Sequence, residues 1–258
     1  MPWLYTIGMY TAGPAIRLAF RPQVEGLENV PRTGGAILAS NHLSVADEWM
    51  LGAVVPRHIA FWAKEEYFNT PGLKGWFYRG VMHAFGAIEV RREGGRAALT
   101  AFDAAIPALQ AGDLVGIYPE GTRSPDGRLY RGRTGVARLA LLAGVPIIPV
   151  GCIGTDAVQP IGTVIPRLGH KVTIRFGEPL DVTGKSMDSS TLRAITDEVM
   201  TRIQRLTGQE YVGRYAPRRT AAEAKPAGEA TASERNGAEK NGAEKNGGEA
   251  GDEPTTSA

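Results

Sequence analysis

The sequence contains a single cysteine, Cys152, among its 258 residues. A lone cysteine excludes a disulfide framework and a cysteine-based zinc site, and it is typical of a protein in a reducing compartment. The charges nearly balance, with 29 Lys and Arg against 27 Asp and Glu and a formal net charge of +2. So small a basic excess argues against nucleic acid as a partner.

The chain also lacks an uninterrupted apolar run long enough to cross a bilayer. A spanning helix needs about 20 apolar residues, whereas Gly8, Gly13 and Pro14 interrupt the uncharged residues 1–16. No Lys or Arg precedes this apolar part and no small-residue cleavage site is evident, so we do not expect a signal peptide. A second uncharged stretch, Leu139–Thr155, contains two prolines and is better interpreted as a helix end, a turn and a buried strand.

The C-terminal part lacks large apolar side chains. From Pro217 to Ala258 there is no Leu, Ile, Val, Met, Phe, Tyr or Trp, and the unit NGAEK occurs twice in succession. Such a segment cannot bury enough apolar area to offset its chain entropy. We therefore expect a disordered Ala/Gly/Glu-rich tail at 216–258, preceded by a folded domain at 22–215.

Short apolar runs alternate with helical periodicity through the rest of the chain. Apolar residues from Leu99 to Leu109 recur at spacings of three and four, and Pro107 is expected to kink or interrupt that helix. The alternation predicts a single α/β domain whose mixed, largely parallel sheet is flanked by helices. We expect helices at 44–51, 99–109, 135–143 and 192–206, and strands at 35–41, 58–63, 87–91, 114–118, 145–153 (broken by its prolines) and 171–176.

The N-terminal residues 1–21 gather apolar and aromatic side chains ahead of several arginines. Two interpretations fit this segment. It could be a helix packed on the protein's own core, or an amphipathic helix at a lipid surface, with Trp and Tyr at headgroup level and arginines against anionic lipid. The side chains concerned are Trp3, Leu4, Tyr5, Ile7, Met9 and Tyr10, followed by Arg17, Arg21 and Arg32.

His42 is the histidine best placed for chemistry, because it follows the expected strand 35–41, where α/β folds present reactive groups. Asp47 can reach the imidazole only if His42 lies in the turn before the helix and Asp47 in its first turn. The spacing Ser44-x-x-Asp47 also fits a capping box, in which Asp47 would bind backbone donors and nothing more. The two roles are compatible, because the helix dipole keeps a carboxylate ionised at this position.

Two further segments could bind anions. Residues 118–124 (YPEGTRS) place a glycine and an arginine at a strand end, where backbone amides and a guanidinium can meet a phosphate. An ordinary tight turn with a surface arginine is the alternative. Residues 86–92 end a strand in two arginines, which alone would indicate a solvated strand terminus.

In their order along the chain, these segments resemble the glycerolipid acyltransferase family, whose best-known members acylate glycerol 3-phosphate or lysophosphatidic acid. His42–Asp47 matches the family's H-x4-D motif, and Pro119–Ser124 matches its P-E-G-T-R-S block. Gly86–Arg92 is similar to its second block and Val145–Val150 to its apolar block. One departure is Arg91, which stands where relatives often carry an acidic residue.

The resemblance implies a role for each motif residue. His42 is expected to be the general base that activates an alcohol for attack on a thioester, and Asp47 to hold the other imidazole nitrogen. The Pro149 block is expected to wall the site. The residues expected to bind the phosphate and glycerol of the acceptor are Arg92, Glu120, Gly121, Thr122, Arg123 and, as a further anchor, Arg133.

The resemblance also implies an O-acyltransferase of phospholipid biosynthesis that needs no cofactor and no metal. The expected acyl donor is acyl-CoA or acyl carrier protein, and the expected acceptor is 1-acylglycerol 3-phosphate in the membrane. The expected location is peripheral, at the cytoplasmic face of the cell membrane, and a membrane-bound acceptor favours residues 1–21 as an amphipathic membrane-contact helix. Glycerol 3-phosphate, another lysophospholipid or a glycolipid alcohol are alternative acceptors, and a non-catalytic lipid-binding protein is the alternative of another class.

Overall fold

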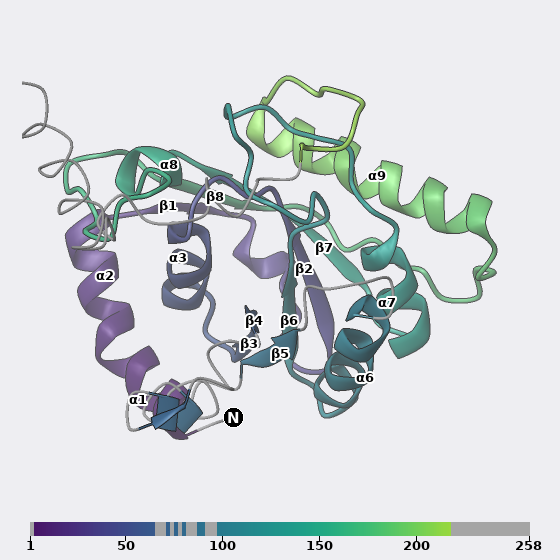
Figure 1. The fold of residues 1–258 in the computed structure, drawn as a ribbon, viewed down its shortest axis with the longest axis horizontal. Helices are drawn as coiled ribbons and strands as arrows, with labels where there is room; N and C mark the ends of the chain where they lie inside the picture. Colours follow the sequence, from purple (N-terminus) through teal and green to yellow (C-terminus); the bar gives the residue numbers. More distant parts are fainter. Residues whose placement is uncertain are drawn as a thin grey trace, which may run out of the picture. The chain divides into compact units, whose positions relative to one another are not determined.

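A six-stranded sheet forms the centre of the described chain, in the order β1-β8-β7-β2-β6-β3 (Figure 1). The computed structural model describes residues 3–64, 71–72, 75–76, 79–80, 87–90 and 97–217. The strands of this sheet are β1 (Gln23–Glu25), β2 (Ala36–Ser40), β3 (Ile59–Ala60), β6 (Leu114–Ile117), β7 (Ile147–Ile153) and β8 (Thr173–Phe176).

The sheet is mixed and mostly parallel, as the sequence predicted. Strands β3, β6, β2 and β7 all run in the same direction. Strand β8 runs antiparallel to β7, and β1 pairs in parallel with β8 at the edge. A separate parallel pair is formed by β4 (Trp62–Lys64) and β5 (Ile88–Val90).

Strand β2 separates the two halves of the hydrophobic core. All its residues are buried, and successive side chains of a strand point to opposite faces. Ile37 and Ala39 therefore pack into one apolar cluster, while Ala36 and Leu38 pack into the other. A strand buried on both faces is expected inside a parallel sheet that has helices on each side.

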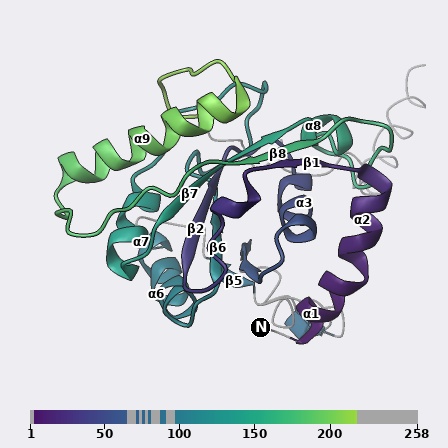
Figure 2. The same cartoon turned by 180° about the vertical axis from the view of Figure 1, so that it is seen from behind.

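Helices cover both faces of the sheet (Figure 2). Side chains from α6, α7 and α9 complete the cluster on one face, and those from α2, α3 and α8 complete the other. The helices are α1 (Trp3–Tyr10), α2 (Ala12–Phe20), α3 (Ala46–Val54), α6 (Ala97–Gln110), α7 (Gly135–Ala143), α8 (Thr155–Val158) and α9 (Ser189–Thr207), with a 3-10 turn, η1 (Leu27–Asn29).

Three local expectations need correction. Strand β7 is not broken by its prolines: it continues through Pro149, whose carbonyl accepts a hydrogen bond from the Gly177 N–H at 2.8 Å. The segment 58–63 divides between β3 and β4, which belong to different sheets. The expected interruption of α6 at Pro107 does not occur: the helix continues to Gln110, since a proline removes its own N–H from the ladder and leaves the N–H groups of the following residues in place.

The N-terminal segment forms two helices instead of the one expected, and they meet at Thr11. One face of α1 is tied to the sheet by Tyr5. Its hydroxyl donates to the Arg57 carbonyl and accepts from the Ile59 N–H, both at 3.3 Å, and its ring meets His58 edge-on. The segment is thus packed on the domain through one of its faces.

The remaining expectations concern the two ends of the chain. Of the described helices, none has both the length and the apolar composition needed to cross a membrane. The tail expected at 216–258 lies outside the described residues from position 218 onward.

Substitution of the two adjacent glycines before β2 tests how closely the start of this strand packs against α6. A Cβ on Gly35 would lie 2.1 Å from the backbone oxygen of Leu109, whereas a Cβ on Gly34 would meet nothing within 4 Å, although its φ is +77°. We expect Gly35→Ala to lower the free energy of unfolding by about 3 kcal/mol. Gly34→Ala should cost only about 1 kcal/mol, the strain of a left-handed alanine. Urea unfolding followed by circular dichroism measures both, and equal losses would contradict the close approach.

Candidate active site

His42 and Asp47 meet at the carboxyl end of β2. The Nδ1 atom of His42 lies 2.8 Å from Oδ2 of Asp47. His42 is in the turn that follows the strand and Asp47 is in the first turn of α3, which is the arrangement their spacing required. A carboxylate can only accept, so this contact places the proton on Nδ1 and leaves Nε2 free to accept one.

Asp47 also organises the backbone between the two residues. Its Oδ2 atom accepts the Leu43 N–H at 2.8 Å and the Ser44 N–H at 2.9 Å, and the Asp47 side chain is fully buried. The hydroxyl of Ser44 accepts the Ala46 N–H at 3.0 Å. One carboxylate oxygen thus serves both the His–Asp pair and the Ser44 N–H that the capping box required. The expected reciprocal bond differs: the Asp47 N–H donates to the Ser44 carbonyl at 3.2 Å, and α3 begins at Ala46 with Val45 as its N-cap, two residues later than expected.

The segment 118–124 lies directly against His42. The ring of Tyr118 is stacked on the imidazole, with the centroids 3.8 Å apart and the planes at 12°. Glu120 accepts the backbone N–H of His42 at 3.2 Å, and the Ser124 N–H donates to the His42 carbonyl at 2.7 Å. This segment was expected to bind an anion, yet three of its residues contact the histidine.

Glu120 is a buried carboxyl group, with 1% of its surface exposed. Its second oxygen accepts the Tyr130 N–H at 2.9 Å. Burial raises the pKa of Glu120 to about 7, and the nearby carboxylates of Asp47 and Asp126 act in the same direction. The two backbone N–H donors, those of Tyr130 and His42, lower this pKa and offset part of the rise.

The other expected substrate-binding residues lie at different places around the turn. Gly121 is exposed with φ +75°, a conformation that favours glycine, and Thr122 and Arg123 are half-buried. Arg133 is exposed, and its side chain lies beside Gly121. The Nε atom of Arg133 is 3.2 Å from the position that a Cβ on Gly121 would occupy. Arg92 lies outside the described residues.

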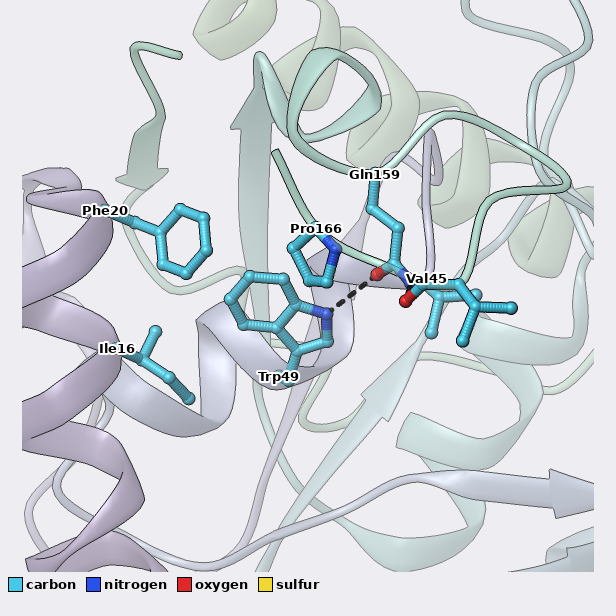
Figure 3. Close-up of a pocket in the computed structure, with 7 residues that line it drawn as sticks. Ile16, Phe20, Val45, Trp49, Gln159 and Pro166 are labelled. Carbon is cyan, nitrogen blue, oxygen red and sulfur yellow. Dashed lines mark hydrogen bonds between the residues drawn. The ribbon is translucent and has the colours of Figure 1, made fainter. Parts of the chain in front are cut away.

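A surface cavity of about 370 Å³ begins next to the histidine loop (Figure 3). Val45, from the loop between His42 and Asp47, forms part of its wall. The indole N–H of Trp49 donates to Oε1 of Gln159 at 3.1 Å, and the hydroxyl of Ser44 donates to the Gln159 carbonyl at 2.6 Å. The lining residues are Ile16, Phe20, Val45, Trp49, Gln159, Val164 and Pro166.

Sequence reasoning assigned no role to Tyr118 or Asn41. The Asn41 side chain is fully buried; it accepts the Cys152 N–H at 2.8 Å and donates to the Cys152 carbonyl at 2.9 Å. Both residues sit at the ends of strands that precede a motif, which is a signal that could have found them. Within the described residues, no group of three His, Cys, Asp or Glu side chains is placed to hold a metal ion.

Comparisons with known proteins converge on one family. The family model described as Acyltransferase matches residues 21–153. The chloroplast 1-acyl-sn-glycerol-3-phosphate acyltransferase LPAT1 of Arabidopsis thaliana is 31% identical over 145 residues, which cover 56% of this chain and 39% of that protein. The 1-acyl-sn-glycerol-3-phosphate acyltransferase of Borreliella burgdorferi is 30% identical over 159 residues, covering 62% and 61%. The chain therefore spans less than two thirds of the length of each.

A solved structure is also similar. The crystal structure of PlsC, the 1-acyl-sn-glycerophosphate (LPA) acyltransferase from Thermotoga maritima, aligns with a TM-score of 0.57 at 29% identity. The alignment covers 79% of this chain and 78% of that one. The likeness thus extends over most of the described domain.

The raised pKa of Glu120 predicts a pH-dependent stability. The folded protein keeps this proton up to a pH of about 7, whereas the unfolded chain loses it near the ordinary value of 4.5. The free energy of unfolding should therefore fall by about 3 kcal/mol between these pH values. Glu120→Gln, which cannot titrate, should lack this part of the fall. Urea unfolding at a series of pH values compares the two proteins, and parallel curves would show that the pKa is not raised.

Proposed function

This chain belongs to the acyltransferase family, and we propose that it transfers a fatty acyl group from an acyl thioester to the free hydroxyl of 1-acylglycerol 3-phosphate, forming phosphatidic acid in phospholipid biosynthesis. The observation that carries the proposal is the 2.8 Å contact between Nδ1 of His42 and Oδ2 of Asp47. A non-catalytic lipid-binding protein has no use for an imidazole held in this way. The names of the relatives support the choice of acceptor.

The proposed mechanism needs one base and no covalent intermediate on the protein. Nε2 of His42 takes the proton of the acceptor hydroxyl as its oxygen attacks the thioester carbonyl carbon. Asp47 stabilises the imidazolium that forms. As the tetrahedral intermediate collapses, the C–S bond breaks and the sulfur leaves with the proton from His42. The products are the new ester and a free thiol, with the histidine neutral again.

The acceptor phosphate is proposed to bind at the turn of residues 121–123. Guanidinium groups suit phosphate because they offer several N–H donors in a fixed plane. Arg123 and Arg133 are the arginines of the described residues that we assign to it, with the backbone of Gly121 and Thr122. Arg133 is held near the turn by its backbone N–H, which donates to the Pro119 carbonyl at 2.8 Å. Arg92 keeps the role that the family resemblance implies.

The cavity beside Val45 is proposed to hold a fatty chain. Its wall is formed mainly by apolar side chains from α2, α3 and the loop after α8. One lining residue, Val45, is three positions after His42 in the sequence. We propose that the polar end of a chain lying there faces the loop that carries His42. Burying a methylene group contributes about 0.8 kcal/mol, so even a partly enclosed chain would add to binding.

We propose that the protein rests on the cytoplasmic face of the membrane through a lipid-contact surface around this cavity. Several large apolar side chains of α1, α2 and the loop after α8 are exposed, among them Leu18 of α2 at 73% and Ile165 of the loop at 81%, and Val164 of the same loop lines the cavity. Exposed apolar groups that gather on one face mark interaction sites, and we propose that these residues do so. The surface comprises Trp3, Ile7, Tyr10, Leu18, Val164, Ile165 and Leu168.

The first test is thiol release from palmitoyl-CoA, with 1-acylglycerol 3-phosphate, glycerol 3-phosphate or no acceptor. We expect release to depend on 1-acylglycerol 3-phosphate, and His42→Ala to lower kcat about 10³-fold, the usual contribution of a general base. His170→Ala is the matched control, because His170 is exposed and lies outside the assigned site.

Other results of this assay would redirect the proposal. Activity of His42→Ala near that of the wild type would reject the histidine as base. Release with glycerol 3-phosphate alone would change the acceptor. Absence of release with every acceptor, repeated with palmitoyl-acyl carrier protein as donor, would reject the proposed activity.

The lipid-contact surface is tested by flotation with phosphatidylcholine vesicles that contain phosphatidylglycerol. We expect Leu18→Glu and Ile165→Glu each to lower the bound fraction, with an affinity loss of about tenfold, because a buried leucine-sized side chain contributes about 1.5 kcal/mol or more. Leu142→Glu is the control: Leu142 is 44% exposed on α7, which covers the other face of the sheet. Equal binding of all three variants would place the membrane contact elsewhere.

A further inference from the structure

The contacts around His42 follow from strand register. Strands β2 and β6 pair with a constant separation of 78 residues, from Ala36 with Leu114 to Ala39 with Ile117. The hydrogen bond between His42 and Glu120 has the same separation of 78 residues. The same offset thus holds beyond the ends of both strands, where the bond joins the His42 backbone to the Glu120 side chain, and residues 118–120 lie beside the loop that follows β2. The 118–124 segment is built as a neighbour of the histidine, independently of any substrate.

Tyr118 covers one face of the imidazole. Its ring lies nearly parallel to that of His42, with the centroids 3.8 Å apart. Asp47 holds the edge of the same imidazole at Nδ1. With one edge and one face occupied, rotation about the side-chain bonds of His42 is blocked, and Nε2 has a fixed direction.

The hydroxyl group of Tyr118 does not explain why a tyrosine occupies this position. The Tyr118 hydroxyl oxygen is buried and has no hydrogen-bond partner within the described residues. Burial and the nearby carboxylates of Glu48 and Asp47 raise the pKa of Tyr118 well above its usual value, so the phenol stays neutral and is unsuited to proton transfer. The part of Tyr118 that the site uses is therefore its aromatic face.

Glu120 holds the main chain of the same histidine. Its two oxygens accept the backbone N–H groups of His42 at 3.2 Å and of Tyr130 at 2.9 Å. With 1% of its surface exposed, the carboxyl group is enclosed by protein. The Ser124 N–H binds the carbonyl of His42 at 2.7 Å. Both polar groups of the His42 backbone are thus held by the 118–124 segment.

We infer that Tyr118 and Glu120 are positioning residues for His42: the tyrosine ring fixes the plane of the imidazole and the glutamate fixes its backbone. The inference rests on the proposed function, in which His42 is the base, and it gives Glu120 a role other than contact with the substrate. The π face of Tyr118 also favours a cation, so it stabilises the imidazolium that forms when the proton arrives. A displacement of about 1 Å in such a group can cost a hundredfold in rate.

Two substitutions at Tyr118 separate the aromatic face from the hydroxyl. Tyr118→Phe keeps the face, so we expect it to retain kcat within about twofold. Tyr118→Leu removes the face, and we expect kcat to fall between about tenfold and a hundredfold with the KM of the acceptor unchanged. Glu120→Gln should likewise lower kcat and leave KM unchanged, whereas a residue that binds the acceptor would raise KM. Thermal unfolding by circular dichroism verifies that each variant is folded, and Tyr118→Met, closer in volume to tyrosine, replaces the leucine variant if that protein does not fold.

The double variant His42→Ala/Tyr118→Leu tests whether Tyr118 acts on kcat through His42. If Tyr118 acts through His42, the double variant should turn over at the same residual rate as His42→Ala alone. A further loss in the double variant, equal kcat for the leucine and phenylalanine variants, or an effect on KM only would overturn the inference. An active His42→Ala would instead reject the proposed function, and the two failures are therefore distinguishable.

Discussion

The pairing of β2 with β6 on one edge and with β7 on the other is the constraint on which the site depends. All three strands are parallel, so their carboxyl ends lie at the same end of the sheet. The segments that follow them, far apart in sequence, therefore meet there. Asn41 strengthens this arrangement, because its side chain exchanges two hydrogen bonds with the backbone of Cys152 and continues the β2–β7 ladder beyond the strand. His42 therefore follows a residue whose main chain and side chain are both fixed.

Asp47 fixes both the orientation of the His42 imidazole and the backbone just before α3. Its Oδ2 atom accepts from the imidazole of His42 and from the N–H groups of Leu43 and Ser44. A buried carboxylate that loses its donors costs several kcal/mol, so the turn cannot open without that cost. The carboxyl group of Glu120 is buried nearby. Burial raises its pKa to about 7, so it can take up a proton near neutral pH and avoid the cost of a buried charge.

Much of the fold could be predicted from the sequence, since apolar patterning and turn residues are local signals. The bounds of α7 and the left-handed Gly144 after it agree with the expected helix at 135–143. Pro149 could not be interpreted in this way, because only the neighbouring strands decide whether a missing N–H disrupts a ladder. The contact of His42 with Asp47 followed from spacing and capping logic. The stacking of Tyr118 and the enclosure of Glu120 depend on the register between β2 and β6, which sequence order does not specify.

The environment of Cys152 has a consequence for side reactions. A protein that handles thioesters risks transthioesterification, in which one of its own thiols captures the acyl group and holds it as a dead-end adduct. The single thiol of this chain is fully buried in β7 beneath the site, 3.4 Å from the hydroxyl of Ser40. Burial raises the pKa of Cys152 far above neutrality, so the thiolate that would attack is essentially absent. Under the proposed function, this burial suppresses self-acylation, so the acyl group of a bound thioester is left for an acceptor alcohol or for water.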